Sequence, residues 1–104
     1  MIRENQEKHA ASLPTPRGIR RACGKELYRT LKRLKHYVPE EKVQEAVELY
    51  YKRVVGHLEW IAQNHSNRKR LADWWDEAVC GEIAKLWGVD RDRLSRAFRD
   101  AFGG

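Results

Sequence analysis

Residues Cys80 to Arg99 read CGEIAKLWGVDRDRLSRAFR, and this stretch decides the fold. Apolar residues recur at helical spacing on both sides of Gly88. Glycine readily adopts the left-handed conformation that ends a helix and turns the chain within few residues. Asp90 is a favourable N-cap for the next helix, and Val89 can fill the corner between the two. The stretch therefore predicts two helices joined by a tight turn.

The small and apolar residues of this stretch assign an inner face to each of the two helices. Ala84 suits a close crossing of the pair, while Leu94 and Ala97 face back onto the first helix. This packing predicts a helix-turn-helix over residues 80–103. The outer face of the second helix then carries polar side chains that point into solvent and could contact a DNA groove. These residues are Arg91, Asp92, Ser95, Arg96 and Arg99. A helical hairpin that never touches nucleic acid has the same pattern, so that alternative stays open.

The second helix of the pair also carries a family resemblance. Leu94 to Gly103 reads LSRAFRDAFG and resembles the recognition helix in the second helix-turn-helix of arabinose-regulator (AraC-type) transcription factors, which typically reads LSRAFRxxFG. The resemblance covers about 20 of the 104 residues. It implies that this helix enters the major groove of DNA and that Phe98 and Phe102 are packing residues. It further implies a set near base edges or phosphate: Arg91, Asp92, Ser95 and Arg96.

The rest of the chain also has helical periodicity. One helix is predicted over residues 18–36, and a second from Pro39 to about residue 63. A third is predicted over residues 67–87, where Gly81 is a point of weakness or division. With the last helix, these predict a compact all-helical bundle of about four helices and a single domain over residues 18–104. Residues 1–17, with two prolines and no period, are interpreted as a flexible N-terminal arm.

Positive charge is concentrated in one segment of the sequence. The chain carries a formal net charge of +6, and residues 17–36 alone hold eight Lys and Arg against the single acid Glu26. A strip of one sign favours a polyanionic partner, and Arg29, Lys32 and Arg33 are its candidate phosphate contacts. The alternative is a solvated helix face that only keeps the protein in solution. Tyr28 and Tyr37 lie among these cations, and their rings suit stacking on single-stranded bases or the edge of the core.

Chemical motifs for catalysis are missing from the sequence. The two cysteines have no C-x-x-C spacing, and the histidines lack the spacing of a metal site. No phosphate-binding glycine loop, nucleophile elbow or catalytic triad pattern occurs. We therefore expect neither enzyme activity, cofactor, metal nor small-molecule substrate. No apolar run approaches the length of a membrane span, and the first residues do not resemble a signal peptide, so we expect a cytoplasmic protein without a membrane partner.

Together these features predict a small basic DNA-binding protein, a transcriptional regulator or accessory factor. A homodimer is possible, because helix-turn-helix proteins commonly read two half-sites. One alternative is a non-enzymatic subunit that grips another protein through a tryptophan-rich surface, since four tryptophans are many for 104 residues. Four core tryptophans are the other interpretation of that count. A last alternative is an RNA binder acting through residues 17–36.

Overall fold

The computed structural model describes residues 13–104, whose regular structure is entirely helical. The elements, in chain order, are α2 (Pro16–Leu34), α3 (Glu40–Gly56), α4 (Leu58–Gln63), α5 (Arg68–Trp75), the π-helical turn η1 (Asp76–Cys80), α6 (Gly81–Trp87) and α7 (Arg91–Phe102). Because α5, η1 and α6 follow one another without a break, the described residues form five continuous helices. The all-helical prediction is confirmed, and the predicted number of four is one too few. None of these helices is both long and apolar enough to cross a membrane.

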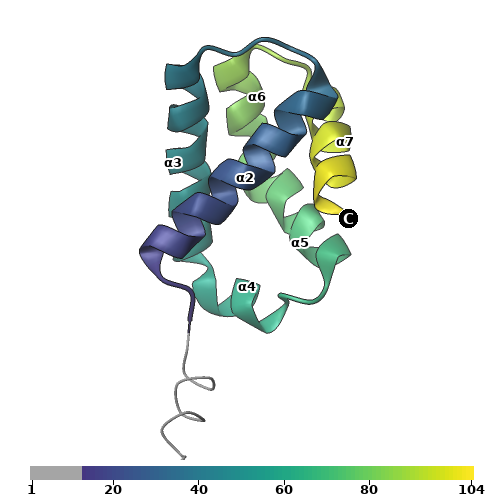
Figure 1. The fold of residues 1–104 in the computed structure, drawn as a ribbon. Coiled ribbons are helices and arrows are strands. Elements are labelled where there is room, and N and C mark those ends of the chain that lie inside the picture. The colour runs from purple at the N-terminus through teal and green to yellow at the C-terminus, as the bar shows by residue number, and fades with distance from the viewer. Residues whose placement is uncertain (1–12) are drawn as a thin grey trace, which may run out of the picture.

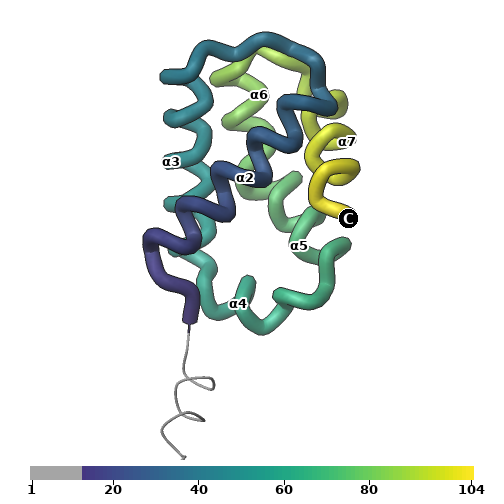
Figure 2. The backbone as a smooth tube through the Cα atoms, viewed as in Figure 1, coloured from purple at the N-terminus to yellow at the C-terminus, as the bar shows by residue number. Residues whose placement is uncertain are grey.

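The helix α2 organises the molecule. It crosses in front of the other helices, with α3 on one side and α7 on the other (Figure 1). Its most extensive packing is against α7, followed by α3. The residues Leu27 and Leu34 are fully or almost fully buried, as their helical spacing predicts. At the opposite end of the molecule from the α2–α3 connection, α4 bridges α3 and α5 (Figure 2).

An aromatic cluster forms the centre of the core. The rings of Trp75 and Phe98 stack with their centroids 3.8 Å apart, and Tyr50 meets both edge-on at 6.2 Å. Such pairs stabilise a core by about 0.5–1.5 kcal/mol beyond the burial of their area. The cluster joins α3, α5 and α7. Trp87 is also buried, and its indole N–H donates to the backbone oxygen of Lys42 at 3.1 Å.

The N-terminal boundary of α2 differs from the prediction. Residues 1–12 of the expected arm lie outside the described residues, but Pro16 and Arg17 belong to the helix rather than to an arm. The side chain of Thr15 accepts a hydrogen bond from the Gly18 N–H at 3.0 Å and caps the helix. Pro16 is the first helical residue, where a missing N–H costs nothing. Pro16, which in the sequence indicates an irregular segment, is therefore the first residue of α2.

The second predicted helix is divided in two. An apolar period runs through Val54, Leu58 and Ile61, and for this reason the sequence predicts one helix to residue 63. In the structure the chain leaves helical geometry at His57, whose φ is −128° and ψ is 31°. Gly56 directly precedes the break, and glycine weakens a helix interior by about 1 kcal/mol relative to alanine. The result is a separate short helix, α4.

The third predicted helix is continuous but changes its winding. Asn67 caps it, accepting a hydrogen bond from the Arg70 N–H at 3.0 Å. One π-helical turn, Asp76–Cys80, ends immediately before Gly81. The predicted weakness at Gly81 thus corresponds to a change from π to α winding. Such π turns are rare and are frequent at functional sites.

Candidate nucleic-acid interface

The turn between α6 and α7 has the predicted chemistry. Gly88 adopts the left-handed conformation with φ 66°, and the Val89 N–H donates to the Ala84 oxygen at 3.0 Å. The carboxylate of Asp90 accepts from the Arg93 N–H at 2.9 Å and caps α7. Three residues therefore separate the two helices. Leu94 and Ala97 are buried on the inner face of α7, as expected.

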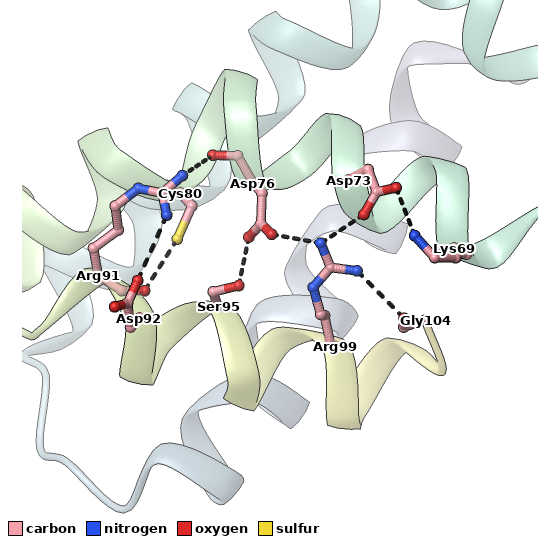
Figure 3. Close-up of polar contacts among 9 residues, drawn as sticks. All are labelled: Lys69, Asp73, Asp76, Cys80, Arg91, Asp92, Ser95, Arg99 and Gly104. Atoms are coloured by element: carbon pink, nitrogen blue, oxygen red, sulfur yellow. Dashed lines mark hydrogen bonds and ion pairs between the residues drawn. The ribbon is translucent and has the colours of Figure 1, made fainter.

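One flank of α7 is fixed to the preceding helix by a polar network centred on Asp76 (Figure 3). The Ser95 hydroxyl donates to one carboxylate oxygen of Asp76 at 2.6 Å, and the Arg99 guanidinium donates to the other at 2.5 Å. Arg99 also donates to Asp73 at 2.7 Å. Arg91 donates to the backbone oxygen of Asp76 at 2.6 Å. Side chains spaced along the whole of α7 thus converge on a single residue of η1.

This network corrects the predicted orientation of Ser95 and Arg99. Both were expected to project into solvent, but both are half-buried, and the side chain of Arg99 is 28% exposed. The hydrogen bonds that Arg99 donates to Asp76 and then to Asp73 raise the pKa of Arg99, and the hydrogen bond donated by Arg99 lowers the pKa of Asp73. These acids hold the two side chains against the protein. The signal in the sequence is the spacing of Asp73 and Asp76, which places two acids on one side of a helix.

The solvent-exposed face of α7 carries fewer of the predicted side chains than expected. Asp92 and Arg96 are exposed as expected, and Arg93, which the sequence argument passed over, lies on the same face. Arg91 has a side chain 48% exposed, although its guanidinium is engaged by Asp76 and lies 3.9 Å from Asp92. Arg96 forms no ion pair within residues 13–104. The three-residue spacing of Arg93 and Arg96 could have indicated their shared face.

The other flank of α7 meets the C-terminal end of α2. The guanidinium of Arg33 binds the Asp100 carboxylate at 2.9 Å, and Arg93 donates to the backbone oxygen of Leu34 at 2.7 Å. Lys35 ends α2 in the left-handed conformation with φ 54°. Between the two helices lies a groove, here called the basic groove, lined by Arg33, Leu34, Lys35, Arg93, Arg96, Ala97, Arg99 and Asp100.

The basic groove combines two sets of residues that the sequence argument treated separately. Arg33 comes from the basic strip and Arg96 from the predicted recognition helix, and both line the same groove. Arg29 and Lys32 are exposed on the same end of α2. Lys35, the residue that ends α2, also lines the groove. The groove holds five Lys or Arg side chains and one acid, Asp100, which is paired with Arg33.

The two cysteines are structural. Burial raises the pKa of the Cys23 thiol to about 12 and that of the Cys80 thiol to about 11, which disfavours the reactive thiolate. Cys80 donates a weak hydrogen bond to the Arg91 oxygen at 3.5 Å. Across the described part of the chain, no group of three or more His, Cys, Asp or Glu side chains is arranged to hold a metal ion.

No family model, curated protein or solved structure matches this chain. The likeness of Leu94 to Gly103 to an AraC-type recognition helix therefore stays a prediction.

Proposed function

We propose that this protein binds duplex DNA through the basic groove and the exposed face of α7, as a small regulator or accessory factor. One observation carries the proposal. Cations from segments about 60 residues apart in the chain, Arg33 and Lys35 on one side and Arg93 and Arg96 on the other, line a single groove. Phosphate neutralisation by such clusters supplies most of the non-specific affinity for nucleic acids.

The network on the opposite flank limits base readout. Ser95 and Arg99 are engaged by Asp76, so they are not proposed as base contacts. Arg93 and Arg96 are both exposed and have no ion partner among the described residues, but Arg93 donates to the Leu34 oxygen, whereas Arg96 has no such contact. Arginine is the most common reader of guanine in the major groove. We infer that phosphate contacts dominate binding and that sequence discrimination rests mainly on Arg96.

The fixed position of α7 also supports the proposal. A recognition element has to be held rigidly, because a loosely held side chain loses affinity to conformational entropy. Buried Leu94 and Phe98 hold one side of α7, and the Asp76 network holds another. The remaining side presents Arg96 beside the basic groove. This arrangement matches the demand for a rigid helix with one open face.

A titration of labelled duplex DNA by fluorescence anisotropy at two salt concentrations tests the proposal. We expect affinity to fall steeply as salt increases. Arg96→Ala is expected to lower affinity about tenfold with unchanged helical content, because one arginine contact is worth about 1–3 kcal/mol. Lys52→Ala, an exposed lysine of α3 outside the basic groove, is the matched control and should bind as the parent does. Equal affinities for the parent and Arg96→Ala would overturn the assignment.

A charge-reversal series tests the contribution of α2. Arg29 and Lys32 form no ion pair within residues 13–104, whereas Arg33 is partly neutralised by Asp100. Arg29→Glu with Lys32→Glu is therefore expected to weaken binding more than Arg33→Glu alone. Each lost phosphate contact should lower the slope of log affinity against log salt by about 1. Binding that does not depend on salt would contradict the electrostatic argument.

RNA binding is the second candidate, and one observation favours it. Tyr37, in the connection that follows Lys35, is 83% exposed and free to stack on an unpaired base. Tyr28 is less suited to stacking, because its hydroxyl donates to the Glu40 carboxylate at 2.8 Å. Single-stranded RNA in the same titration separates the candidates. Tighter binding of single-stranded RNA that is lost in Tyr37→Ala would favour RNA over duplex DNA.

The protein-interaction alternative has lost part of its basis. Trp75 and Trp87 are buried and Trp74 is half-buried. Of the four tryptophans only Trp60 is exposed, with 37% of its surface accessible. A tryptophan-rich surface is therefore not present. A homodimer stays a prediction, which sedimentation of the protein with and without duplex DNA would test.

A further inference from the structure

A cavity of about 280 Å³ lies at the other end of α2, away from the basic groove. Side chains of α2, α3, α4 and α5 surround it, and Phe102 at the end of α7 closes part of it. The lining is mainly apolar, with Ile19, Tyr50, Ile61 and Leu71 among its residues. A dry apolar cavity of about 150 Å³ accommodates benzene. The volume here therefore suits a molecule with two fused rings.

Within residues 13–104, the short helix α4 leaves this cavity unfilled. None of its residues is buried, and its main packing partner is the adjacent α3. Leu58 and Ile61 line the cavity but stay only half-buried. Apolar surface of this kind gains about 25 cal/mol for each Å² removed from water. A ligand that fills the cavity would bury these side chains and draw α4 onto the rest of the fold.

One wall of the cavity carries a carboxylate whose hydrogen bonding is incomplete. An oxygen of Glu26 is buried and has no hydrogen-bond partner within residues 13–104. Burial raises the pKa of this carboxyl, although Arg29, Arg68 and Lys25 act in the opposite direction. Arg68 does not form an ion pair with it, and its guanidinium stacks on the Phe102 ring at 4.3 Å. A buried acceptor left unsatisfied costs about 1–3 kcal/mol.

The indole nitrogen of Trp74, a second residue lining the cavity, is also buried without a hydrogen-bond partner in the described chain. Apolar walls with a small number of placed polar groups are the usual composition of a small-molecule site. The acidic group determines which ligand charge is complementary. A cation or a neutral N–H donor satisfies Glu26, whereas a ligand carboxylate would be repelled by it.

We propose that this cavity binds a small bicyclic aromatic amine, with its rings against the apolar walls and its amino group donating to Glu26. The site is separate from the proposed DNA interface, so it stands whether or not the protein binds DNA. Binding needs no covalent step. The sequence predicts no small-molecule substrate, because the lining residues come from five helices and share no motif.

Isothermal titration calorimetry of the full chain with tryptamine tests the proposal. We expect saturable binding with one site per chain. Indole-3-acetate has the same rings with the opposite charge, and it should bind at least about tenfold more weakly, since a tenfold change corresponds to 1.4 kcal/mol. Absence of tryptamine binding, or preference for indole-3-acetate, would overturn the proposal.

Three variants locate the site. Glu26→Gln should weaken tryptamine binding about tenfold while leaving the weak binding of indole-3-acetate unchanged or stronger. Ala62→Phe places a ring in the cavity from α4 and should abolish binding of both probes. Gln63→Phe adds the same ring to an exposed neighbour outside the lining and should bind as the parent does. If Ala62→Phe and Gln63→Phe behaved alike with unchanged affinity, tryptamine would bind elsewhere and the assignment would be wrong.

Discussion

The two ends of α2 lie in opposite surroundings. At its C-terminal end, Leu34 is 2% exposed, Arg33 is paired with Asp100, and α7 packs along the helix. At its N-terminal end, Ile19 and Cys23 line a cavity whose far wall is the loosely packed α4. Among the described residues, the first end is packed against α7, and the second borders unfilled volume. This difference is consistent with the two proposals, surface recognition of nucleic acid at one end and binding of a small molecule at the other.

The largest expected effect compares a fully buried residue of α7 with a half-buried residue beside the cavity. Leu94→Ala removes a fully buried side chain of α7 and should lower the free energy of unfolding by about 2–5 kcal/mol. Ile61→Ala, on α4 beside the cavity, should cost less than about 1.5 kcal/mol, because the side chain is only half-buried. Urea denaturation of both variants measures the difference. Equal losses would show that α4 is packed as firmly as α7.

Sequence reasoning succeeded where the determining interactions are local. Gly88 and Asp90 act on residues within four positions, so their conformations follow from residue type alone. It failed where distant residues decide. The break at His57 is invisible because the apolar period continues through it. Arg99 was placed in solvent because its partners, Asp73 and Asp76, lie more than 20 residues earlier in the chain.

The candidate site was predicted in two unconnected halves for the same reason. Arg33 and Arg96 were each named from the sequence, but their common groove depends on how α2 packs on α7. Lys35 was counted in the basic strip but was not named as a phosphate contact, because its place in the groove follows from where α2 ends. The apolar cavity could not be anticipated, since helical periodicity indicates which residues face inward and not whether they fill the space.

The next effect compares two acids that bind arginines on opposite flanks of α7. Asp76→Ala removes the acceptor for Ser95 and Arg99 and should destabilise the protein by about 1.5–3 kcal/mol, the range for hydrogen bonds to charged groups. Asp100→Ala removes the exposed partner of Arg33 and should cost about 0–1 kcal/mol. Thermal and urea denaturation measure both. A larger loss for Asp100→Ala would show that the Arg33–Asp100 pair, and not the Asp76 network, is the stronger polar contact of α7.

A smaller effect compares a glycine in the α6–α7 turn with a glycine inside α2. Gly88→Ala forces a side chain into a left-handed conformation and should cost about 1–2 kcal/mol. Gly24→Ala makes the same change inside α2, where nothing lies within 4 Å of the new methyl group, and should stabilise by about 0.5–1 kcal/mol. Opposite shifts in melting temperature are therefore expected. If both variants shifted in the same direction, the turn would not depend on the glycine conformation.

The smallest effect is a dependence on pH that distinguishes the cavity end of α2 from the opposite end. Burial raises the pKa of Glu26 in the folded state, so the favourable contribution of this carboxyl is present at acid pH, below its unfolded pKa. That contribution is lost as the pH rises through the folded pKa. Glu26→Gln removes the ionisation, and we expect the variant to become more stable relative to the parent between acid and neutral pH.

Glu40, which follows the α2–α3 connection, provides a comparison of opposite sign. Hydrogen bonds from Gln44 and then Tyr28 lower the pKa of Glu40, so its contribution is present above the unfolded pKa and is lost as the pH falls through the folded one. Glu40→Gln should therefore become less stable relative to the parent as the pH rises from acid to neutral. Urea denaturation of the parent and both variants at pH 3 and pH 7 measures the two differences.

The titration of all other groups is common to the three proteins, so the differences in unfolding free energy isolate the two carboxyls. Glu26→Gln, like Glu40→Gln, could instead lose stability relative to the parent as the pH rises. That result would show that the folded protein stabilises Glu26 as a carboxylate. The cavity wall would then have no unsatisfied acceptor.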